Sequence, residues 1–87
     1  MPRVRCLSLF GVELIFYSND HDPPHFHAVK RDHWHYRVLF LLPESEMLQQ
    51  KAGPRCMPRS TRRRLLARAA ACRIELLEEW EATRSDD

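Results

Sequence analysis

The hydrophobic residues of this chain fall into short clusters separated by turn-forming residues, and they adopt a helical spacing only in the C-terminal third. The N-terminal part is rich in Val, Leu, Ile and Phe, with a turn signal at Phe10-Gly11. We therefore predict two strands there, at about residues 4–9 and 12–18. The next segment reads SNDHDPP (18–24) and is predicted to be a loop, because Asn, Asp and two prolines are unsuited to a central strand.

The middle of the chain is predicted to contain the strongest strands. HFHAV (25–29) has strand character, KRDH (30–33) is polar enough to turn, and WHYRVLFLL (34–42) is rich in aromatic and aliphatic residues. Three prolines and a glycine make 43–58 irregular, with a half-strand near Glu46–Leu48.

A single helix is predicted from Arg59 to about Arg84, where Gly and Pro are absent and Ala, Leu, Arg and Glu dominate. Apolar residues recur there at steps of three and four, which predicts a stripe packed across the sheet. The stripe consists of Leu65, Leu66, Ala69, Cys72, Leu76, Leu77 and Trp80.

These elements predict an α+β fold. It comprises a small antiparallel sheet of three to four strands at about 4–42, an irregular connection at 43–58, and one long helix at about 59–84 on one face of the sheet. A chain of 87 residues is too short for a second core, so we predict a single domain. Three cysteines without a CxxC pair, no signal peptide and no membrane-length apolar run predict a cytoplasmic protein.

All five histidines lie between His21 and His35. On a strand over 25–29, His25 and His27 point to one face and Phe26 to the other. We expect Phe26 to enter the core beneath the helix, which leaves both histidines on the open face.

Three interpretations of the first three histidines remain open. They make structural hydrogen bonds, for example to Asp20 or Asp22; they bind a metal such as zinc; or they act as acid–base groups or contact nucleic acid. The candidate metal ligands are Asp20, His21, His25 and His27. The same three histidines are the candidate catalytic residues, but no nucleophile stands at motif spacing and there is no Gly-rich phosphate loop. We therefore expect neither catalysis nor a cofactor other than zinc.

The second histidine pair, His33 and His35, depends on the register of the hairpin. A two-residue turn at Arg31-Asp32 would place the two histidine pairs on opposite faces, whereas a three-residue turn would place them on the same face. The sequence does not decide between the two registers.

The charges of the predicted helix are reversed relative to its dipole. Residues 55–73 include seven arginines and no acid, whereas residues 75–87 include six acids and one arginine. Each charge placed against the helix dipole in this way costs about 0.3–1 kcal/mol. A local conflict of this kind often marks a functional surface. The candidate binding residues are Arg59, Arg63, Arg64 and Arg68. The alternative is a solvated face whose arginines pair with Glu44 and Glu46.

Two other arginines are predicted to lie in the apolar stripe, at about 100° per residue. These are Arg62 and Arg73, whose aliphatic stems would pack on the sheet. We expect Arg73 to bond a carboxylate, with Asp20 as the first candidate, or backbone carbonyl groups. Phe26, Arg73 and Trp80 are the candidate structural residues.

Two stretches, LFGVELIFYSNDHDPPHFHA (9–28) and CRIELLEEW (72–80), resemble a small bacterial family known as domain of unknown function 4160. The matching elements are Phe10-Gly11, the DHDPPHFH core, and Arg73, Glu75, Leu76, Leu77 and Trp80 in the helix. The family has no settled activity. The resemblance implies one half of a two-gene module, either regulatory or toxin–antitoxin-like.

We therefore expect a non-catalytic binding module that uses the basic helix face to engage nucleic acid or an acidic protein surface. Its protein partner would be the neighbouring gene's product or a nucleoprotein complex; a homodimer is compatible with the small core, and no membrane is involved. One alternative is a histidine- or metal-dependent nuclease of the toxin type, which requires the histidines and the outer arginines to line one cleft. Another is a mobile-element inhibitor or adaptor that acts on a nucleoprotein complex.

Overall fold

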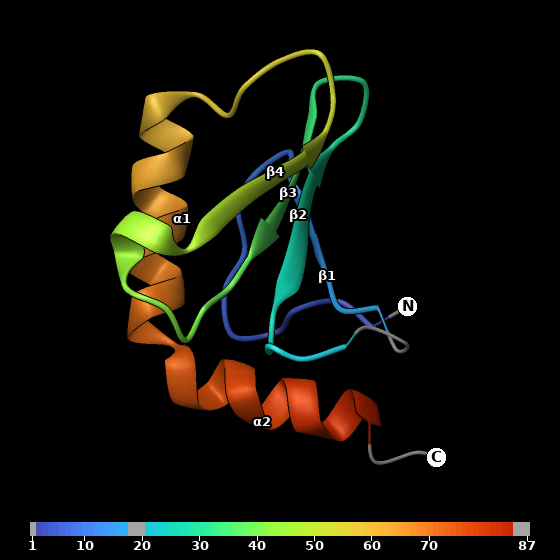
Figure 1. Cartoon of the computed structure of the whole chain (residues 1–87), viewed down its shortest axis with the longest axis vertical. Helices are drawn as coiled ribbons and strands as arrows, with labels where there is room; N and C mark the ends of the chain where they lie inside the picture. The colour runs from blue at the N-terminus through green and yellow to red at the C-terminus, as the bar shows by residue number, and fades with distance from the viewer. Residues whose placement is uncertain (1, 18–20, 85–87) are drawn as a thin grey trace.

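The computed structural model describes residues 2–17 and 21–84. Four strands form one antiparallel sheet in the order β1-β2-β3-β4, and two C-terminal helices follow (Figure 1). The elements are β1 (Glu13–Ile15), β2 (Phe26–Lys30), β3 (Trp34–Val38), the short 3-10 helix η1 (Glu44–Glu46), β4 (Leu48–Ala52), α1 (Arg59–Ala71) and α2 (Arg73–Arg84). The α+β prediction is confirmed.

The first predicted strand, at 4–9, is wrong. Residues in this region make only isolated bridges, Arg3 with Ile15 and Leu9 with Val12. The N–H of Val4 donates to the carbonyl of Leu14, so the N-terminal segment runs beside β1 and covers that edge of the sheet. Apolar composition indicated burial correctly here, but it did not indicate regular pairing.

The last strand also differs from the prediction. The half-strand expected near Glu46–Leu48 is the end of η1 followed by a full strand, β4. Apart from Leu48, the residues of β4 are exposed, because β4 lies at the edge of the sheet. It therefore lacks the alternation of buried and exposed residues that marks a strand in the sequence. The pairing of β3 with β4 is irregular between His35 and Tyr36.

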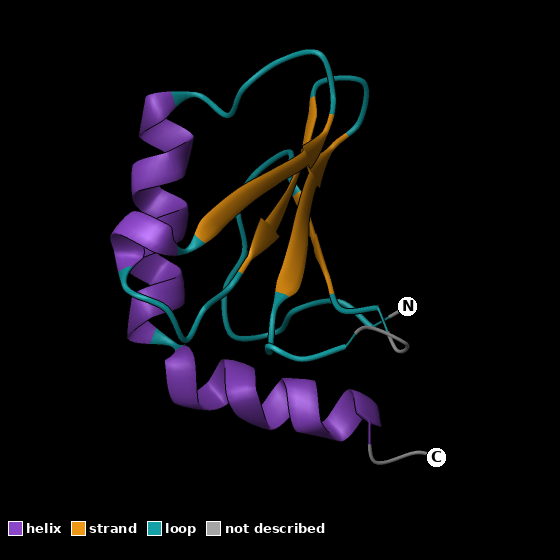
Figure 2. Ribbon diagram, viewed as in Figure 1, coloured by secondary structure: helices purple, strands orange, loops and turns teal. Residues whose placement is uncertain are grey.

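The core lies between the sheet and the helices (Figure 2). Phe26, Leu65, Leu76 and Trp80 belong to one buried cluster, as predicted. The ring of Phe16 joins them, with its centroid 6.1 Å from that of Phe26 and 6.4 Å from that of Trp80. Burial of these large side chains is the main source of stability in a domain of this size.

The single long helix of the prediction is two helices, separated at Cys72. A straight helix over the same residues would be about 39 Å long, which exceeds the 35 Å longest dimension of the molecule. A five-residue strand spans only about 17 Å, so most of such a helix would project beyond the sheet. The break instead turns α2 across the end of the sheet (Figure 1), where Leu76 and Trp80 reach the core.

Truncation of Trp80 to Ala should destabilise the protein by about 3–5 kcal/mol, since its buried indole packs against Phe16. This is a large fraction of the stability of a small domain. Urea unfolding followed by circular dichroism measures the loss. Ile74→Ala is the matched control on the same helix, because Ile74 is 74% exposed, and it should change stability by less than about 0.5 kcal/mol. Equal effects of the two changes would contradict this account of how α2 docks.

Two glycines with positive φ provide a second test. Gly53 (φ 108°) lies against the start of β3, and an added Cβ would come within 2.6 Å of the His33 carbonyl oxygen and the Trp34 Cα. Gly11 (φ 76°) has open space around the same position. We expect Gly11→Ala to cost about 1–2 kcal/mol through backbone strain alone. Gly53→Ala should cost about 3 kcal/mol or more, because steric overlap adds to the strain. Unfolding midpoints that rank the two variants in the opposite order would refute the placement of the β4–α1 loop.

Candidate functional site

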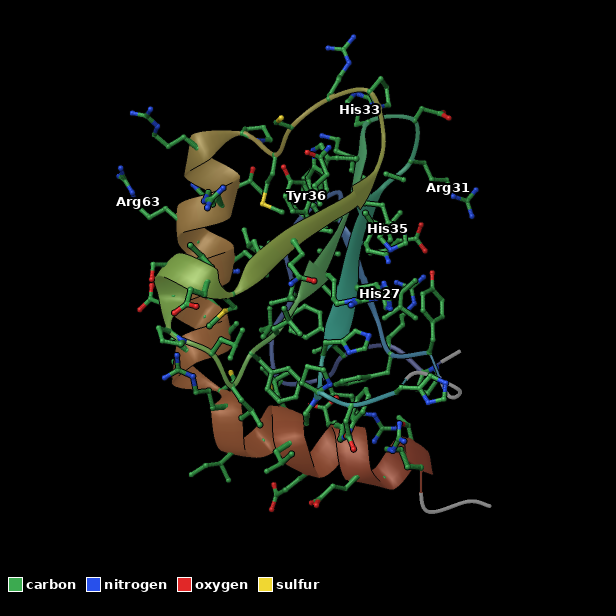
Figure 3. All side chains as sticks on the ribbon, in the orientation of Figure 1. His27, Arg31, His33, His35, Tyr36 and Arg63 are labelled. Atoms are coloured by element: carbon green, nitrogen blue, oxygen red, sulfur yellow. The ribbon has the colours of Figure 1, made fainter. Side chains whose placement is uncertain are left out.

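Two polar surfaces lie on opposite sides of the molecule. Figure 3 shows Arg63 projecting from α1 on one side and His27 and His35 on the other side of the sheet, with Tyr36 directed toward α1 between them. We call the first surface, formed by Arg59, Arg62, Arg63, Arg64 and Arg68, the arginine face. We call the second, formed by His27, His35, Arg37 and Lys51, the histidine face.

The turn between β2 and β3 determines the composition of the histidine face. Lys30 pairs with Trp34 and Val29 with His35, so the turn has three residues, Arg31 to His33. The N–H of His33 donates to the carbonyl of Lys30, and Asp32 has φ 67°, a conformation that Asp tolerates better than most residues. Of the two registers that the sequence left open, the structure therefore has the one that places His27 and His35 on the same face.

His27 and His35 are joined by a hydrogen bond of 2.8 Å between Nδ1 of His27 and Nε2 of His35. One nitrogen must donate and the other accept, so the bond requires at least one of these two rings to be neutral. The ring of Tyr17 lies 4.2 Å from that of His27 and covers it, and His27 is only 4% exposed. The expectation that His27 lies on the face away from the helices is confirmed, but neighbouring rings shield it from solvent.

His25 lies beside His27, as alternation predicts, with their ring centroids 5.1 Å apart, but it is buried and not open to solvent. Nδ1 of His25 donates to the carbonyl of Pro23 at 2.8 Å, and its ring lies 5.4 Å from that of Trp80. His25 is therefore buried at the end of the sheet beside α2, where it packs like a core residue.

Of the predicted metal ligands, His25 and His27 lie together, with their ring centroids 5.1 Å apart. His21 is exposed, and Asp20 lies outside the described residues. Within residues 2–17 and 21–84, no group of three or more His, Cys, Asp or Glu side chains is placed to hold a metal ion.

Two positive charges, those of Lys51 and Arg37, lie near His35 on the histidine face. Burial lowers the pKa of His35, and the nearby charges of Lys51 and Arg37 lower it further. Arg37 pairs across the sheet with His27, and its buried Nε has no hydrogen-bond partner in the described chain. Sequence reasoning did not identify Arg37 and Lys51 because it lacked the strand β4 and the register that bring them beside His35.

The arginine face differs from the prediction at Arg62. This residue was expected in the apolar stripe, but it is exposed, because the buried side of α1 begins only at Leu65. Arg68 is exposed, and one of its Nη atoms donates to the carbonyl of Ser8 at 2.6 Å. In the described chain, the arginines of this face form no ion pair with a carboxylate. Glu44 and Glu46, in the short helix η1 that contacts α1, form no ion pair with these arginines in the described chain.

The N-terminus of α1 strengthens this basic character. Its N-cap is Pro58, which makes no side-chain capping bond, and the first turn contains no acidic residue. The first N–H groups of a helix have no partner within it, and they contribute about half a positive charge. The helix dipole and the arginines therefore favour the same kind of ligand, an anion.

Arg73 is a structural residue rather than part of the arginine face. It is half-buried, and its Nε and one Nη donate to the carbonyls of Phe40 and Leu42 at 2.8 and 2.9 Å. These bonds tie the start of α2 to the segment that follows β3. The other partner considered for it, Asp20, lies outside the described residues.

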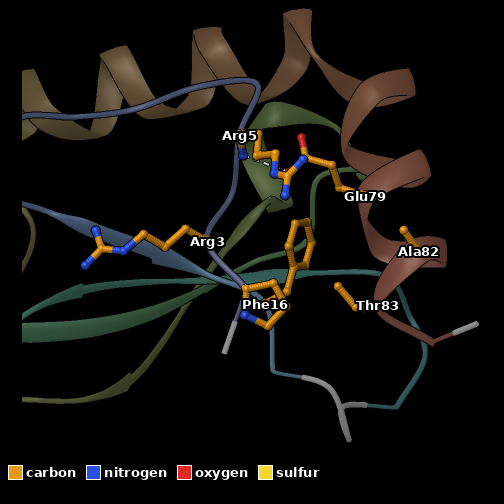
Figure 4. A pocket seen from close by; sticks show the side chains of 7 residues that line it. Arg3, Arg5, Phe16, Glu79, Ala82 and Thr83 are labelled. Atoms are coloured by element: carbon orange, nitrogen blue, oxygen red, sulfur yellow. Dashed lines mark hydrogen bonds between the residues drawn. The ribbon is translucent and has the colours of Figure 1, made fainter. Parts of the chain in front are cut away.

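A pocket of about 250 Å³ lies between the N-terminal segment and α2 (Figure 4). It is lined by Pro2, Arg3, Arg5, Phe16, Glu79, Ala82 and Thr83. The carboxylate of Glu79 accepts the backbone N–H groups of Arg5 and Cys6, at 2.7 and 3.1 Å. Burial raises the pKa of the nearby Cys6 thiol, and its contacts with Cys72 and Glu79 raise it further. The Cys6 thiol is thus a poor nucleophile. The sequence analysis did not identify Glu79 as the acceptor for the backbone of the N-terminal segment.

The model of one family, described as Domain of unknown function (DUF4160), matches residues 11–81. The chain belongs to the DUF4160 family. The matched region extends from the turn before β1 almost to the end of α2, and it includes the DHDPPHFH segment, α1 and Trp80. The resemblance noted in the sequence is therefore confirmed. No curated protein and no solved structure matches this DUF4160 chain. Neither helix in the described chain has the length and apolar character that a membrane span requires.

The histidine face predicts a specific loss of stability in acid. Because the pKa of His35 is lowered in the folded state, the unfolded chain binds its proton more readily. The contribution of His35 to the free energy of unfolding is therefore complete above about pH 6.5, the ordinary pKa of histidine, and it is lost as the pH falls below that value. Urea midpoints measured between about pH 8 and pH 5 should fall less steeply for His35→Gln than for the wild type.

His33→Gln is the matched control for loss of an imidazole. His33 lies in the turn and bonds the Arg31 carbonyl instead of His27. If His33→Gln flattens the pH dependence as much as His35→Gln does, the effect does not belong to the histidine face.

Proposed function

We propose that this DUF4160 chain is a non-catalytic nucleic-acid-binding module that engages phosphates through the arginine face of α1. The observation that best supports the proposal is a group of exposed arginines, unpaired with carboxylates in the described chain, most of which lie in the first half of an uncapped helix. Phosphates are the anions that a row of guanidinium groups recognises best. The three free cysteines are compatible with action in the cytoplasm.

The arrangement favours nucleic acid over a compact anion. Arg59 and Arg63 lie one turn apart on one side of α1, and Arg64 and Arg68 lie one turn apart on another. Cβ atoms at this spacing are about 5–6 Å apart, and the long side chains can reach successive phosphates of a backbone. A single small anion could engage only one or two of these groups.

The nuclease alternative requires the histidines and the outer arginines to line one cleft. Arg63 and the His27–His35 pair are instead on opposite sides of the molecule (Figure 3). Each of the two histidines is also engaged by the other. We therefore favour binding without catalysis. The adaptor and acidic-protein alternatives use the same arginine face. They differ from the proposal in the ligand that this face binds.

The test is the salt dependence of binding to nucleic acid. If three or four arginines meet phosphates of a duplex, log Kd should rise with log salt concentration with a slope of about 3–4. The double variant Arg63→Gln, Arg64→Gln should reduce this slope by about two, with little change in sequence preference, because phosphate contacts carry no sequence information. Fluorescence anisotropy with a labelled oligonucleotide measures both quantities. The fold should be unaffected or slightly stabilised, since positive charge is removed near the helix N-terminus.

The matched control is Lys30→Gln, Arg31→Gln. It also removes two exposed positive charges, but from the last residue of β2 and the first residue of the turn that follows, and Figure 3 shows Arg31 on the side of the molecule opposite Arg63. An equal reduction of the slope by this control would indicate a general charge effect. Binding to an acidic protein with no measurable affinity for nucleic acid would refute the proposal in favour of the adaptor alternative.

A further inference from the structure

Phe10 is the most exposed of the large apolar side chains in the described chain. Its exposed fraction is 106%, compared with 74% for Ile74 and 46% for Leu41. It occupies the second position of a β-turn in which the N–H of Val12 donates to the carbonyl of Leu9 at 3.2 Å. The third position is Gly11, whose φ of 76° suits a type II turn. The turn needs glycine at position 11, but nothing in it needs an aromatic residue at position 10.

Phe10 is tied to the arginine face. The bond from Arg68 to the Ser8 carbonyl fixes the N-terminal segment against α1, two residues before Phe10. A shallow groove between the segment and the helix is lined by Cys6, Leu7, Ser8, Arg68, Ala71 and Cys72. Two extended residues span about 7 Å, and Arg64 lies one turn from Arg68 on the same side of α1. The exposed ring of Phe10 thus lies within two residues of the point where Arg68 holds the N-terminal segment.

The surroundings of Phe10 favour a nucleic-acid base over an apolar protein surface. The core of a protein–protein interface is a contiguous apolar patch from which charged residues are depleted. Phe10 instead stands between the half-buried Leu9 and Gly11, and Arg68 bonds the backbone two residues before it. Proteins that hold single strands combine a basic groove with exposed aromatic rings on which bases stack.

We propose that Phe10 is a base-stacking residue and that the preferred ligand is a nucleic acid with unpaired bases, a single strand or a loop. This inference rests on the proposed function and specifies its ligand. A base in a duplex is already stacked on both faces and would have to be flipped out at a cost of a few kcal/mol, whereas an unpaired base is free to cover the ring. Arg64 and Arg68 then neutralise phosphates on either side of the stacked nucleotide.

The experiment compares the affinity of the full chain for a single strand of about 12 nucleotides and for the duplex of the same sequence. Phe10→Ala should weaken single-strand binding by roughly 5- to 150-fold, the effect of losing one stacked base. Duplex binding should change little. Phe10→Trp should retain the affinity, and its exposed indole should be quenched when the single strand binds. Ile74→Ala, which removes another exposed apolar side chain, is the matched control and should have no effect.

The outcomes separate the two proposals. If the wild type binds neither oligonucleotide, the proposed function fails and the stacking role fails with it. If the wild type binds and Phe10→Ala leaves single-strand affinity unchanged, the arginine face is retained and the stacking role is overturned. Equal losses in Phe10→Ala and Ile74→Ala also overturn it. Because Phe10 contributes nothing to the buried core, thermal unfolding of Phe10→Ala should match that of the wild type.

Discussion

The indole of Trp80 packs beside Phe16 and His25 at the end of the sheet, and this contact constrains where both helices lie. For Trp80 to reach the core, α2 has to cross the end of the sheet, and the chain has to leave the axis of α1 at Cys72. Glu79, one residue earlier, then holds the N-terminal segment through two backbone N–H groups. Arg73, at the start of α2, fixes the segment after β3. Helices, N-terminus and sheet are thus joined around one aromatic side chain.

The same constraint exposes the first turns of α1. With α2 occupying the end of the sheet, α1 contributes Leu65 and Ala69 to the core, and no residue before Leu65 in this helix is buried. The N-terminal turns are therefore free of packing requirements, and arginines there cost little beyond their conflict with the helix dipole. Exposed charge on this part of the helix is a consequence of how the core is built.

Sequence patterns predicted the elements whose neighbours are local in the chain. The aromatic and aliphatic residues of β2 and β3 and the apolar stripe of the helical region were enough to identify a sheet covered by a helical region. The helix break was not predictable, because no Gly or Pro marks Cys72 and the cause is the limited length of the sheet. The strand β4 was not predictable either, since four of its five residues are exposed.

The site residues divide in the same way. The exposed positions of the arginine face follow from helical spacing, except that of Arg62. Arg62 is exposed because the first buried residue of α1 is Leu65. The pairing of His27 with His35 depends on one extra residue in the turn, which a sequence permits in either form. His25 illustrates a further limit: alternation places its ring beside that of His27, but its burial depends on Trp80 of α2, which is distant in the sequence.

The two edges of the sheet are protected in different ways. Residues 2–4 run along β1 and close that edge with backbone hydrogen bonds, whereas β4 is the last strand at the other edge. An open edge is a template for edge-to-edge aggregation, which natural sheets discourage with lysine and with irregular pairing. β4 has both features, Lys51 and the register shift opposite His35 and Tyr36. Even at high local concentration, copies of this chain would therefore be kept from joining their sheets into fibrils.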